Sequence, residues 1–318
     1  MTLSVIIATH NRASLLDECL QHIARQRFKA GDEVIVADNG STDATPETLA
    51  RHQQTFPVPL RIVDEPVPGK SRALARALAV ATGDVLAFTD DDVNVGDGWL
   101  DAIRAAMADP AQALIGGPVA PRWQRGAPRW LRLGDRGYGP LAAPLALLDY
   151  GDRAVPLGSR TALGANLAVR RDVIRRVGGF ALHLGKLRGT LLSGEDHELC
   201  RRVQALGLRA TYWPAARVTH WVPVDRMRIR YFLAWFFWSG ITHAALEEGR
   251  ARDRSLLGVP LYLIRRLVGG TLAALGAAAT GNLSRAVERG IEAAFAAGYA
   301  AGRWRLAGAG SRQIAQPV

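Results

Sequence analysis

Apolar and polar positions follow two periods along the first hundred residues, one typical of buried strands and one typical of amphipathic helices. Continuous runs rich in Val, Ile and Leu predict strands, and apolar residues three or four positions apart predict the helices between them. The predicted strands cover residues 3–9, 32–38, 60–65 and 84–89, and the predicted helices cover residues 12–26, 41–54, 69–83 and 98–109. A Ser or Thr cap is expected for the second helix, and Gly83 is expected to close the third. This alternation favours a mostly parallel α/β sheet flanked by helices.

Residues 117–162 interrupt this alternation and predict a long irregular excursion with short helices. Its prolines are Pro118, Pro121, Pro128, Pro140, Pro144 and Pro156. Residues 162–180 then predict a strand followed by a helix, residues 195–207 a helix, and residues 209–220 one or two strands. The α/β pattern therefore resumes after the excursion.

The last part of the chain, from about Arg226, consists of apolar and aromatic helical runs with interspersed arginines. We therefore divide the chain into an α/β domain over residues 1–225 and a C-terminal α-helical region over residues 226–318. No stretch reaches 18 uninterrupted apolar residues, and Arg265 and Arg266 break the best candidate. Helices that lie at a membrane interface are therefore expected in preference to a spanning helix. The alternative is a helical subdomain with an ordinary buried face.

The net charge of +11 lies entirely in the C-terminal part, because residues 201–318 contain 17 Arg against 6 acidic residues. Such asymmetry indicates an anionic partner, either nucleic acid or anionic lipid. The aromatic residues 235–238 stand beside the arginines of residues 226–230 within long apolar runs, which fits lipid better than a nucleic-acid groove. An anionic membrane surface is therefore the expected partner, and no nucleic acid is expected.

The two cysteines, Cys19 and Cys200, match no disulfide framework and no cysteine-based zinc site. No secretory leader is visible before the first predicted strand. Together these features predict a reducing, cytoplasmic compartment.

Three consecutive carboxylates, Asp90, Asp91 and Asp92, directly follow the apolar run that predicts the fourth strand. Adjacent carboxylates repel one another and are costly to bury, so they need water or a cation. Ligands of an open parallel sheet bind beyond the carboxyl ends of its strands. The polar residues expected at the other strand ends are Thr9, Arg12, Asp38 and Lys70. Carboxylates in this place predict Mg²⁺ or Mn²⁺ bound with substrate phosphates, and the alternative is a solvated turn.

Six segments between residues 3 and 222 carry a resemblance to a known family. They read "SVIIATHNR", "VIVADNGSTD", "PGKSRALA…ATGDVLAFTDDDV", "GANLAVRRDVIRRVGGF", "SGEDHELCRRVQALG" and "VTHW". Each motif alone is weak, but their order and spacing together are specific. The chain resembles the inverting family 2 glycosyltransferases, which have the Rossmann-like GT-A fold.

The resemblance implies a role for each motif residue. The nucleotide would be bound by Ala8, Thr9, Arg12, Asp38, Lys70, Asp90 and Asp91, with Asp38 on the base. Asp92 and His220 would hold the Mg²⁺ or Mn²⁺ ion. Asp196 would be the catalytic base, with its pKa raised toward neutrality by Glu195. Gly164, Asn166 and Glu195 would line the substrate site. The alternatives are that Asp196 only caps a helix and that His220 is an ordinary buried or surface histidine.

The sequence also departs from the family pattern. Leu74 and Ala75 stand where many relatives have Arg-Asn, so Lys70, Arg72 or Arg76 would take over the phosphate contact. His10 replaces a usual Tyr. The Gln-x-x-Arg-Trp signature of processive synthases is absent, which favours single sugar additions.

The function implied is metal-dependent transfer of a sugar, with inversion, from a nucleotide-diphosphate sugar to an acceptor hydroxyl. The product would be a cell-envelope glycan or a glycolipid. The enzyme would be bound peripherally at the inner face of the cell membrane, and a lipid-linked acceptor is one candidate. One alternative is a sugar nucleotidyltransferase, although "ATHNRASLL" lacks the glycines of an early phosphate loop. The other is an inactive relative that binds anionic membranes.

Overall fold

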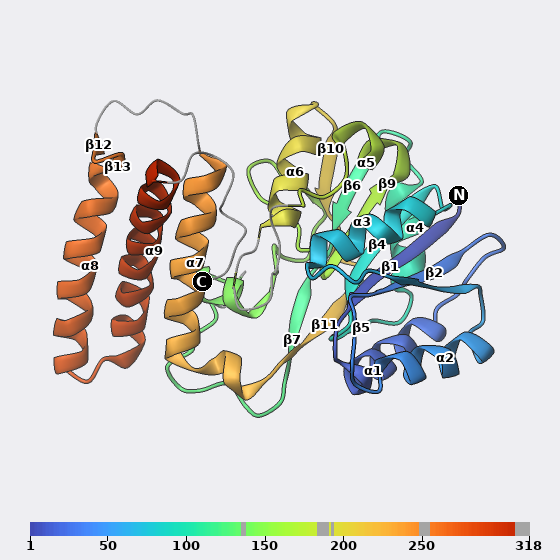
Figure 1. Ribbon diagram of the computed structural model, residues 1–318, viewed down its shortest axis with the longest axis horizontal. Coiled ribbons are helices and arrows are strands. Elements are labelled where there is room, and N and C mark those ends of the chain that lie inside the picture. The colour runs from blue at the N-terminus through green and yellow to red at the C-terminus, as the bar shows by residue number, and fades with distance from the viewer. Residues whose placement is uncertain (135–137, 183–190, 192–193, 248–254, 309–318) are drawn as a thin grey trace.

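The computed structural model describes residues 1–134, 138–182, 191, 194–247 and 255–308. Figure 1 shows a large α/β body and, beside it, a bundle of the long C-terminal helices. The elements up to residue 123 are β1 (Leu3–Thr9), α1 (Ala13–Ala24), β2 (Glu33–Asp38), α2 (Thr45–Thr55), β3 (Leu60–Asp64), α3 (Lys70–Val80), β4 (Val85–Asp90), β5 (Val93–Val95), α4 (Trp99–Met107), β6 (Gln112–Gly116) and β7 (Val119–Trp123).

The later elements begin with a 3₁₀ helix. They are η1 (Pro140–Leu145), β8 (Val155–Pro156), β9 (Asn166–Arg170), α5 (Arg171–Val177), α6 (Glu195–Ala205), β10 (Arg209–Tyr212), β11 (Val218–Val222), η2 (Val224–Met227), α7 (Ile229–Leu246), β12 (Ser255–Leu256), β13 (Val259–Pro260), α8 (Leu261–Ala279) and α9 (Leu283–Gly308).

The main sheet has eight strands in the order β3-β2-β1-β4-β9-β6-β10-β8. Strands β1 to β4 are parallel, and β10 is parallel to β6. Strand β9 runs antiparallel between β4 and β6, and β8 is antiparallel to β10. Because β1, β2 and β4 are buried along nearly their whole length, they appear in the sequence as continuous apolar runs. The expected mostly parallel α/β sheet flanked by helices is confirmed.

A second sheet of three strands, β5-β11-β7, lies beside the end of β4. Strand β5 pairs antiparallel with β11, and β7 pairs parallel with β11. The sequence pattern did not predict β5, β6 or β7. Strand β5 has only three residues, too few to establish a period, and β7 contains Pro121, which is unfavourable inside a strand. Residues 117–162 are otherwise irregular as expected, apart from η1 and the short β8.

Two expectations about helix ends are wrong. Helix α2 has Ala44 at its N-cap, and Asp43 Oδ1 accepts the Thr45 N–H at 3.0 Å. Helix α3 ends at Val80, before Gly83. Gly83 lies so close to β1 that an added Cβ would be 2.5 Å from the Ser4 nitrogen. Position 83 therefore requires glycine because the backbone of β1 comes too close to leave room for a side chain.

The C-terminal helices pack as a layer with α9 between α7 and α8 (Figure 1). Helices α7 and α9 meet at glycines, because an added Cβ on Gly298 would lie 1.8 Å from the Phe237 carbonyl oxygen. A second hydrophobic core joins α7 and α9 to the excursion, and it includes Leu141, Leu145, Val222, Phe232 and Ile291, whereas α8 packs on α9. Helices α7 and α9 are therefore packed onto the α/β body.

Two features of the C-terminal region bear on the expected membrane contact. Within the described residues, α8 alone is long and apolar enough to cross a membrane, judged by length and composition. The aromatic residues 235–238 are half-buried, and Phe236 packs against the second core. The exposed apolar surface therefore lies on α8 and not on the aromatic cluster.

Candidate active site at the carboxyl ends of β1 and β4

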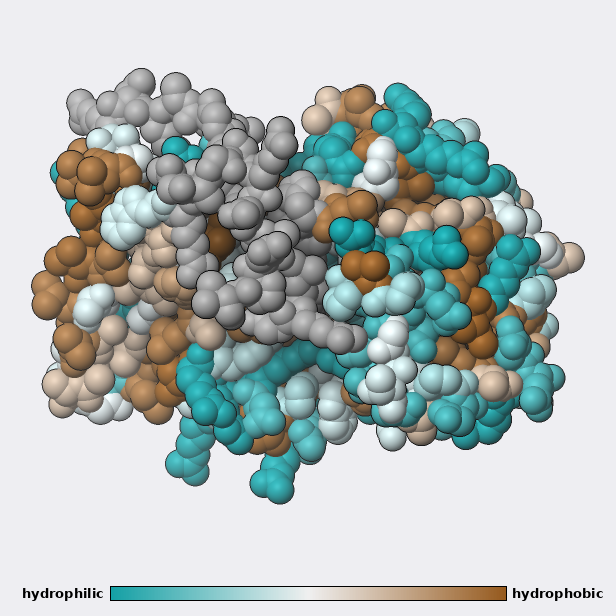
Figure 2. All heavy atoms as spheres, in the orientation of Figure 1, coloured by the Kyte–Doolittle hydropathy of each residue, from teal (hydrophilic) through white to brown (hydrophobic). Residues whose placement is uncertain are grey.

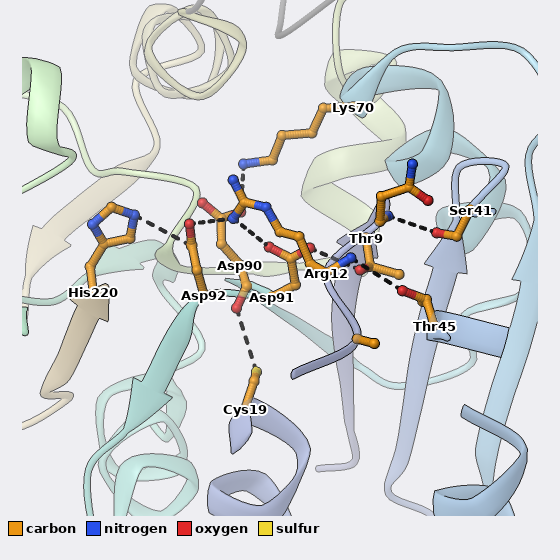
Figure 3. Close-up of polar contacts among 12 residues, drawn as sticks. Thr9, Arg12, Cys19, Ser41, Thr45, Lys70, Asp90, Asp91, Asp92 and His220 are labelled. Atoms are coloured by element: carbon orange, nitrogen blue, oxygen red, sulfur yellow. Dashed lines mark hydrogen bonds and ion pairs between the residues drawn. The ribbon is translucent and has the colours of Figure 1, made fainter. Parts of the chain in front are cut away.

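The three carboxylates lie at the carboxyl end of β4 (Figure 3). Asp90 is the last residue of β4, and Asp91 and Asp92 make the turn into β5. In the sheet register Asp90 lies opposite Ala8 of β1. Asp91 and Asp92 are buried, so the solvated-turn alternative does not hold for them.

Arg12 provides the positive charge that buried carboxylates require. Its Nη1 lies 3.1 Å from Asp91 Oδ1 and 2.5 Å from Asp92 Oδ2 (Figure 3). Thr9 Oγ1 donates a hydrogen bond of 2.8 Å to the other oxygen of Asp91. Burial lowers the pKa of Arg12, but the carboxylates outweigh burial and raise it. Arg12 is thus fixed as a cation between two acids.

Asp92 has a further set of partners that come from far along the chain. The antiparallel register of β5 and β11 puts His220 opposite Val93, and His220 Nε2 lies 3.3 Å from Asp92 Oδ1. His220 is only 2 % exposed. Arg226, in η2, has Nη2 3.7 Å from Asp92 Oδ2 and Nη1 3.3 Å from His220 Nε2. In the sequence Arg226 stands among the arginines expected at the membrane, but the structure places it in this site.

The neighbouring acids Asp91 and Asp92 differ in how readily they bind a proton. Burial raises the pKa of Asp91 to about 6, with help from Asp92 and against the opposing charge of Arg12. Burial also acts on Asp92, but His220, Arg12 and Arg226 outweigh it and hold the pKa of Asp92 well below its usual range. Asp92 is therefore the fully ionised member of the pair at neutral pH.

Lys70 begins α3 and faces the same group of acids. Its Nζ lies 2.5 Å from Asp90 Oδ1 and 3.9 Å from Glu195 Oε1. Burial lowers the pKa of Lys70, but Asp90 and Glu195 outweigh burial and raise it. Burial and the charge of Asp196 raise the pKa of Glu195. Lys70 thus joins the β4 acids to the acids of α6.

Asp196 lies in the first turn of α6 with both carboxylate oxygens bonded. Oδ2 accepts the Gly164 N–H at 2.8 Å, and Oδ1 accepts the His197 N–H at 2.8 Å with His197 Nδ1 at 2.9 Å. Burial raises its pKa, but His197, the Gly164 N–H and Lys70 outweigh burial and hold it well below its usual range. The expectation that Glu195 raises this pKa toward neutrality is therefore wrong in this state of the site.

Two other predicted residues lie outside this network. Asp38 ends β2 opposite Thr9 of β1, and its Oδ1 accepts the Ser41 N–H at 3.0 Å. Asp38 lies at the same edge of the sheet as the site, and no described residue donates a hydrogen bond to its second oxygen, Oδ2.

Asn166 has a structural environment. Its Nδ2 donates to the carbonyls of Pro118 (2.9 Å) and Ala216 (2.7 Å), and its Oδ1 accepts the Trp99 Nε1–H at 2.9 Å. It also lies so close to Gly117 that an added Cβ there would be 2.4 Å from Nδ2. These bonds use both amide hydrogens and one lone pair of the oxygen, so Asn166 holds neighbouring segments of the fold together, and its contact with substrate stays a prediction.

The donor groups of Asp92 and His220 fit a divalent cation. Neighbouring ligands of an octahedral ion at about 2.0–2.1 Å lie about 3 Å apart, and Asp92 Oδ1 and His220 Nε2 are 3.3 Å apart. In the described part of the chain, no three His, Cys, Asp or Glu side chains lie together so that they could hold a metal ion. An ion here would therefore need ligands from substrate phosphate and water, as Mg²⁺ commonly has.

Comparison with known proteins agrees with this arrangement. The family described as Glycosyl transferase family 2 matches residues 4–178. Succinoglycan biosynthesis protein ExoM of Rhizobium meliloti is 31 % identical over 251 residues, which is 77 % of this chain and 75 % of that protein. The glucosyl-dolichyl phosphate glucuronosyltransferase of Haloferax volcanii is 25 % identical over 263 residues, 78 % of each chain.

A solved structure shares the fold. The mannosyltransferase PcManGT from Pyrobaculum calidifontis, in complex with GDP-Man and Mn²⁺, aligns with a TM-score of 0.58 and 23 % identity over 98 % of this chain and 76 % of that chain. The main sheet therefore has the GT-A arrangement.

Proposed function

Because the chain belongs to glycosyl transferase family 2 and is a glycosyltransferase, we propose that it transfers a sugar, with inversion, from a nucleotide-diphosphate sugar to an acceptor hydroxyl in a metal-dependent reaction. The observation that supports this most is that one edge of the sheet brings together two groups of charged residues. Asp92 meets His220 in one of them, and Lys70 meets Asp90 and Glu195, next to Asp196, in the other. The family match favours this reaction over nucleotidyl transfer.

The charge balance of the site supports binding of a divalent metal. Its acids are Asp90, Asp91, Asp92, Glu195 and Asp196, and its permanent cations are Arg12, Lys70 and Arg226. Full ionisation of the acids leaves two negative charges beyond these permanent cations, and the neighbouring histidines His197 and His220 balance them only when they are protonated. Asp92 and His220 would hold Mg²⁺ or Mn²⁺, which supplies positive charge to the departing diphosphate.

The nucleotide would lie across the ends of β1 and β2. Asp38 would accept from the base with its free oxygen, and Ala8 and Thr9 would line the pocket beside it. Arg12 and Lys70 now pair with Asp91, Asp92 and Asp90, and both have donors that suit a diphosphate. Lys70 compensates for the absence of the Arg-Asn pair at positions 74 and 75, because its Nζ already reaches the site.

Asp196 would act as the general base. It is ionised at neutral pH and would accept the proton of the acceptor hydroxyl as that oxygen attacks the anomeric carbon, although its lowered pKa makes it a weaker base than a carboxylate that titrates near neutrality. Glu195 would keep Lys70 positioned, and Gly164 would hold Asp196 through its N–H while leaving room for the sugar. A single displacement inverts the anomeric centre and forms no sugar–enzyme bond.

The acceptor is proposed to be a cell-envelope glycan or a lipid-linked sugar at the inner face of the cell membrane. Two similar proteins support this by name, one in succinoglycan biosynthesis and one acting on glucosyl-dolichyl phosphate. The exposed apolar helix α8 supports an interfacial location.

Isothermal titration calorimetry with UDP and with GDP, each with and without Mn²⁺, tests the proposal. The full-length protein is expected to bind one nucleotide at least about tenfold more tightly with Mn²⁺. Asp92→Asn should abolish that gain, and Asp97→Asn, at an exposed position in the turn after β5, should keep it. Binding of neither nucleotide, or an unchanged manganese effect in Asp92→Asn, would refute the metal site.

A further inference from the structure

Helix α8 exposes most of its circumference. Its buried residues are Leu263, Gly270 and Ala277, spaced seven apart along one narrow seam. Large apolar side chains elsewhere on the helix are exposed: Leu261, Val268, Leu272 and Leu275, with Leu272 66 % exposed. Hydrophobic atoms gather on this outer side of the bundle in Figure 2. An apolar surface of this kind marks a contact with lipid or protein.

A basic groove of about 310 Å³ runs between α8 and α9. Arg265 and Arg266 line it from α8, and Arg289 lines it from α9. Arg289 is paired with Glu292 at 3.2 Å, whereas Arg265 and Arg266 form no ion pair with any described residue. The groove therefore offers two guanidinium groups that no described acid pairs with, beside the Arg289–Glu292 pair that also lines it.

Two neighbouring glycines shape this groove, one by letting the helices approach closely and the other by leaving the groove open. Gly270 allows close helix packing, because an added Cβ would lie 3.2 Å from the Arg289 carbonyl oxygen. An added Cβ on Gly269 would meet nothing within 4 Å, and Gly269 lines the groove. A larger side chain at position 269 would therefore fill the groove without clashing with the backbone.

We propose that the groove between α8 and α9 binds the phosphate of an anionic phospholipid while the exposed side chains of α8 enter the acyl-chain boundary. Guanidinium groups bind phosphate oxygens through paired N–H donors. Arginines on an interfacial helix reach headgroups while their neighbours are buried in lipid. This site depends on the proposed membrane location and is independent of the proposed sugar-transfer chemistry.

Charge favours lipid over a second copy of the chain as the occupant. A symmetric dimer through α8 would bring each copy's Arg265 and Arg266 near the same residues of the other copy. Residues 201–318 carry 17 Arg against 6 acidic residues, so the repulsion would be reinforced by the surroundings. An anionic bilayer instead attracts each arginine near its surface.

Flotation of the full-length protein with vesicles tests the site. Vesicles of phosphatidylcholine with phosphatidylglycerol are compared with vesicles of phosphatidylcholine alone. The variant Arg265→Gln/Arg266→Gln is expected to bind the anionic vesicles at least about tenfold more weakly than the natural protein. Arg285→Gln, on α9 but outside the groove, is the matched control and should lose less than about threefold.

Two glycine variants distinguish binding in the groove from a general effect of charge and apolar surface on vesicle binding. Gly269→Leu fills the groove and should reduce the preference for anionic vesicles despite its added apolar side chain. Gly276→Leu, also on α8 with open space around it, should keep that preference. Equal behaviour of the two leucine variants, equal losses in the arginine variants, or dimerisation through α8 without flotation would overturn the proposal. Manganese-dependent nucleotide binding should be unchanged in every variant, so failure of this site is distinguishable from failure of the proposed function.

Discussion

At the scale of single residues, the partners of a carboxylate decide its behaviour more than its position in the sequence. Asp91 and Asp92 are adjacent and both buried, yet the pKa of Asp91 is raised to about 6 and that of Asp92 is held well below its usual range. The difference comes from His220 and Arg226, which face Asp92.

Asp196→Asn tests the base at this scale. The change removes the proton acceptor and keeps the shape, so transfer is expected to fall by about 10²–10⁴-fold. Nucleotide affinity in the presence of Mn²⁺ should change little, because the nucleotide is bound by other residues. Steady-state transfer assays and calorimetry on the same preparation measure the two quantities. A matched loss of affinity and turnover would assign Asp196 to donor binding instead.

Glu33 gives a pH-dependent contribution to stability. It is buried and accepts hydrogen bonds from Ser4 Oγ (2.7 Å) and from the N–H and hydroxyl of Thr82 (2.7 and 2.6 Å). Burial raises its pKa, but these bonds and Arg61 outweigh burial and lower it below 4.5. Its stabilisation is therefore complete above pH 4.5 and is lost as the pH falls through the lower folded value.

Glu33→Gln should accordingly flatten the dependence of unfolding free energy on pH below about 4.5. Urea unfolding at a series of pH values from 7 to 3 measures it. Glu47→Gln, an exposed change in the first turn of α2, is the control and should leave the slope as in the natural protein. Identical slopes in the two variants would contradict the role of Glu33.

At the scale of elements, short strands assemble the site. Strand β5 has three residues, but its antiparallel register with β11 brings His220 to Asp92 across more than a hundred residues of sequence. Helix α6 does the same for Asp196, which reaches the Gly164 N–H just before β9. The sequence pattern predicted α6 and a strand near β11, but it missed β5, whose three residues are held in place by their pairing with β11.

The α7–α9 contact provides the prediction at this scale. Gly298→Ala should destabilise the protein by about 1–3 kcal/mol, because its Cβ would overlap the Phe237 carbonyl oxygen and separate the helices. Gly276→Ala, in open space on α8, should stabilise it by about 0.4–1 kcal/mol through the unfolded chain. Chemical unfolding of both variants measures whether each substitution lowers or raises the free energy of unfolding. A stabilising Gly298→Ala would mean that the helices do not meet at this glycine.

At the scale of the whole molecule, the C-terminal helices and the α/β body share a hydrophobic core. Phe232 of α7 is fully buried and packs edge-to-face on Trp130 of the excursion, with ring centroids 5.0 Å apart. The boundary predicted at residues 225 and 226 thus falls between segments that contribute to one core. Because the parts share buried surface, they are expected to unfold together.

Phe232→Ala tests this coupling. The lost packing should cost about 3–5 kcal/mol and lower the melting temperature of the whole molecule in a single transition. Leu272→Ala, on the exposed face of α8, should change stability by no more than about 0.5 kcal/mol. Differential scanning calorimetry reports both. A separate early transition that leaves the α/β body intact would establish two independent folding units.

The sequence by itself determined the α/β class, the four strands β1 to β4 and the polar strand ends that form the site. Buried parallel strands need continuous apolar runs, and ligands bind beyond their carboxyl ends, so local pattern and chemistry were sufficient. The resemblance added Asp196 and His220, which no local pattern singles out.

Only the tertiary structure decided the rest, because it depends on contacts between distant residues. It brought Arg226 into the site, assigned Asn166 to the fold, and reversed the expected shift in the pKa of Asp196. It also showed which C-terminal apolar residues are buried. Those of α7 and α9 pack in the second core on the α/β body, whereas most of those on α8 are exposed. An apolar run records that a side chain avoids water, but the packing of the whole chain selects its partner.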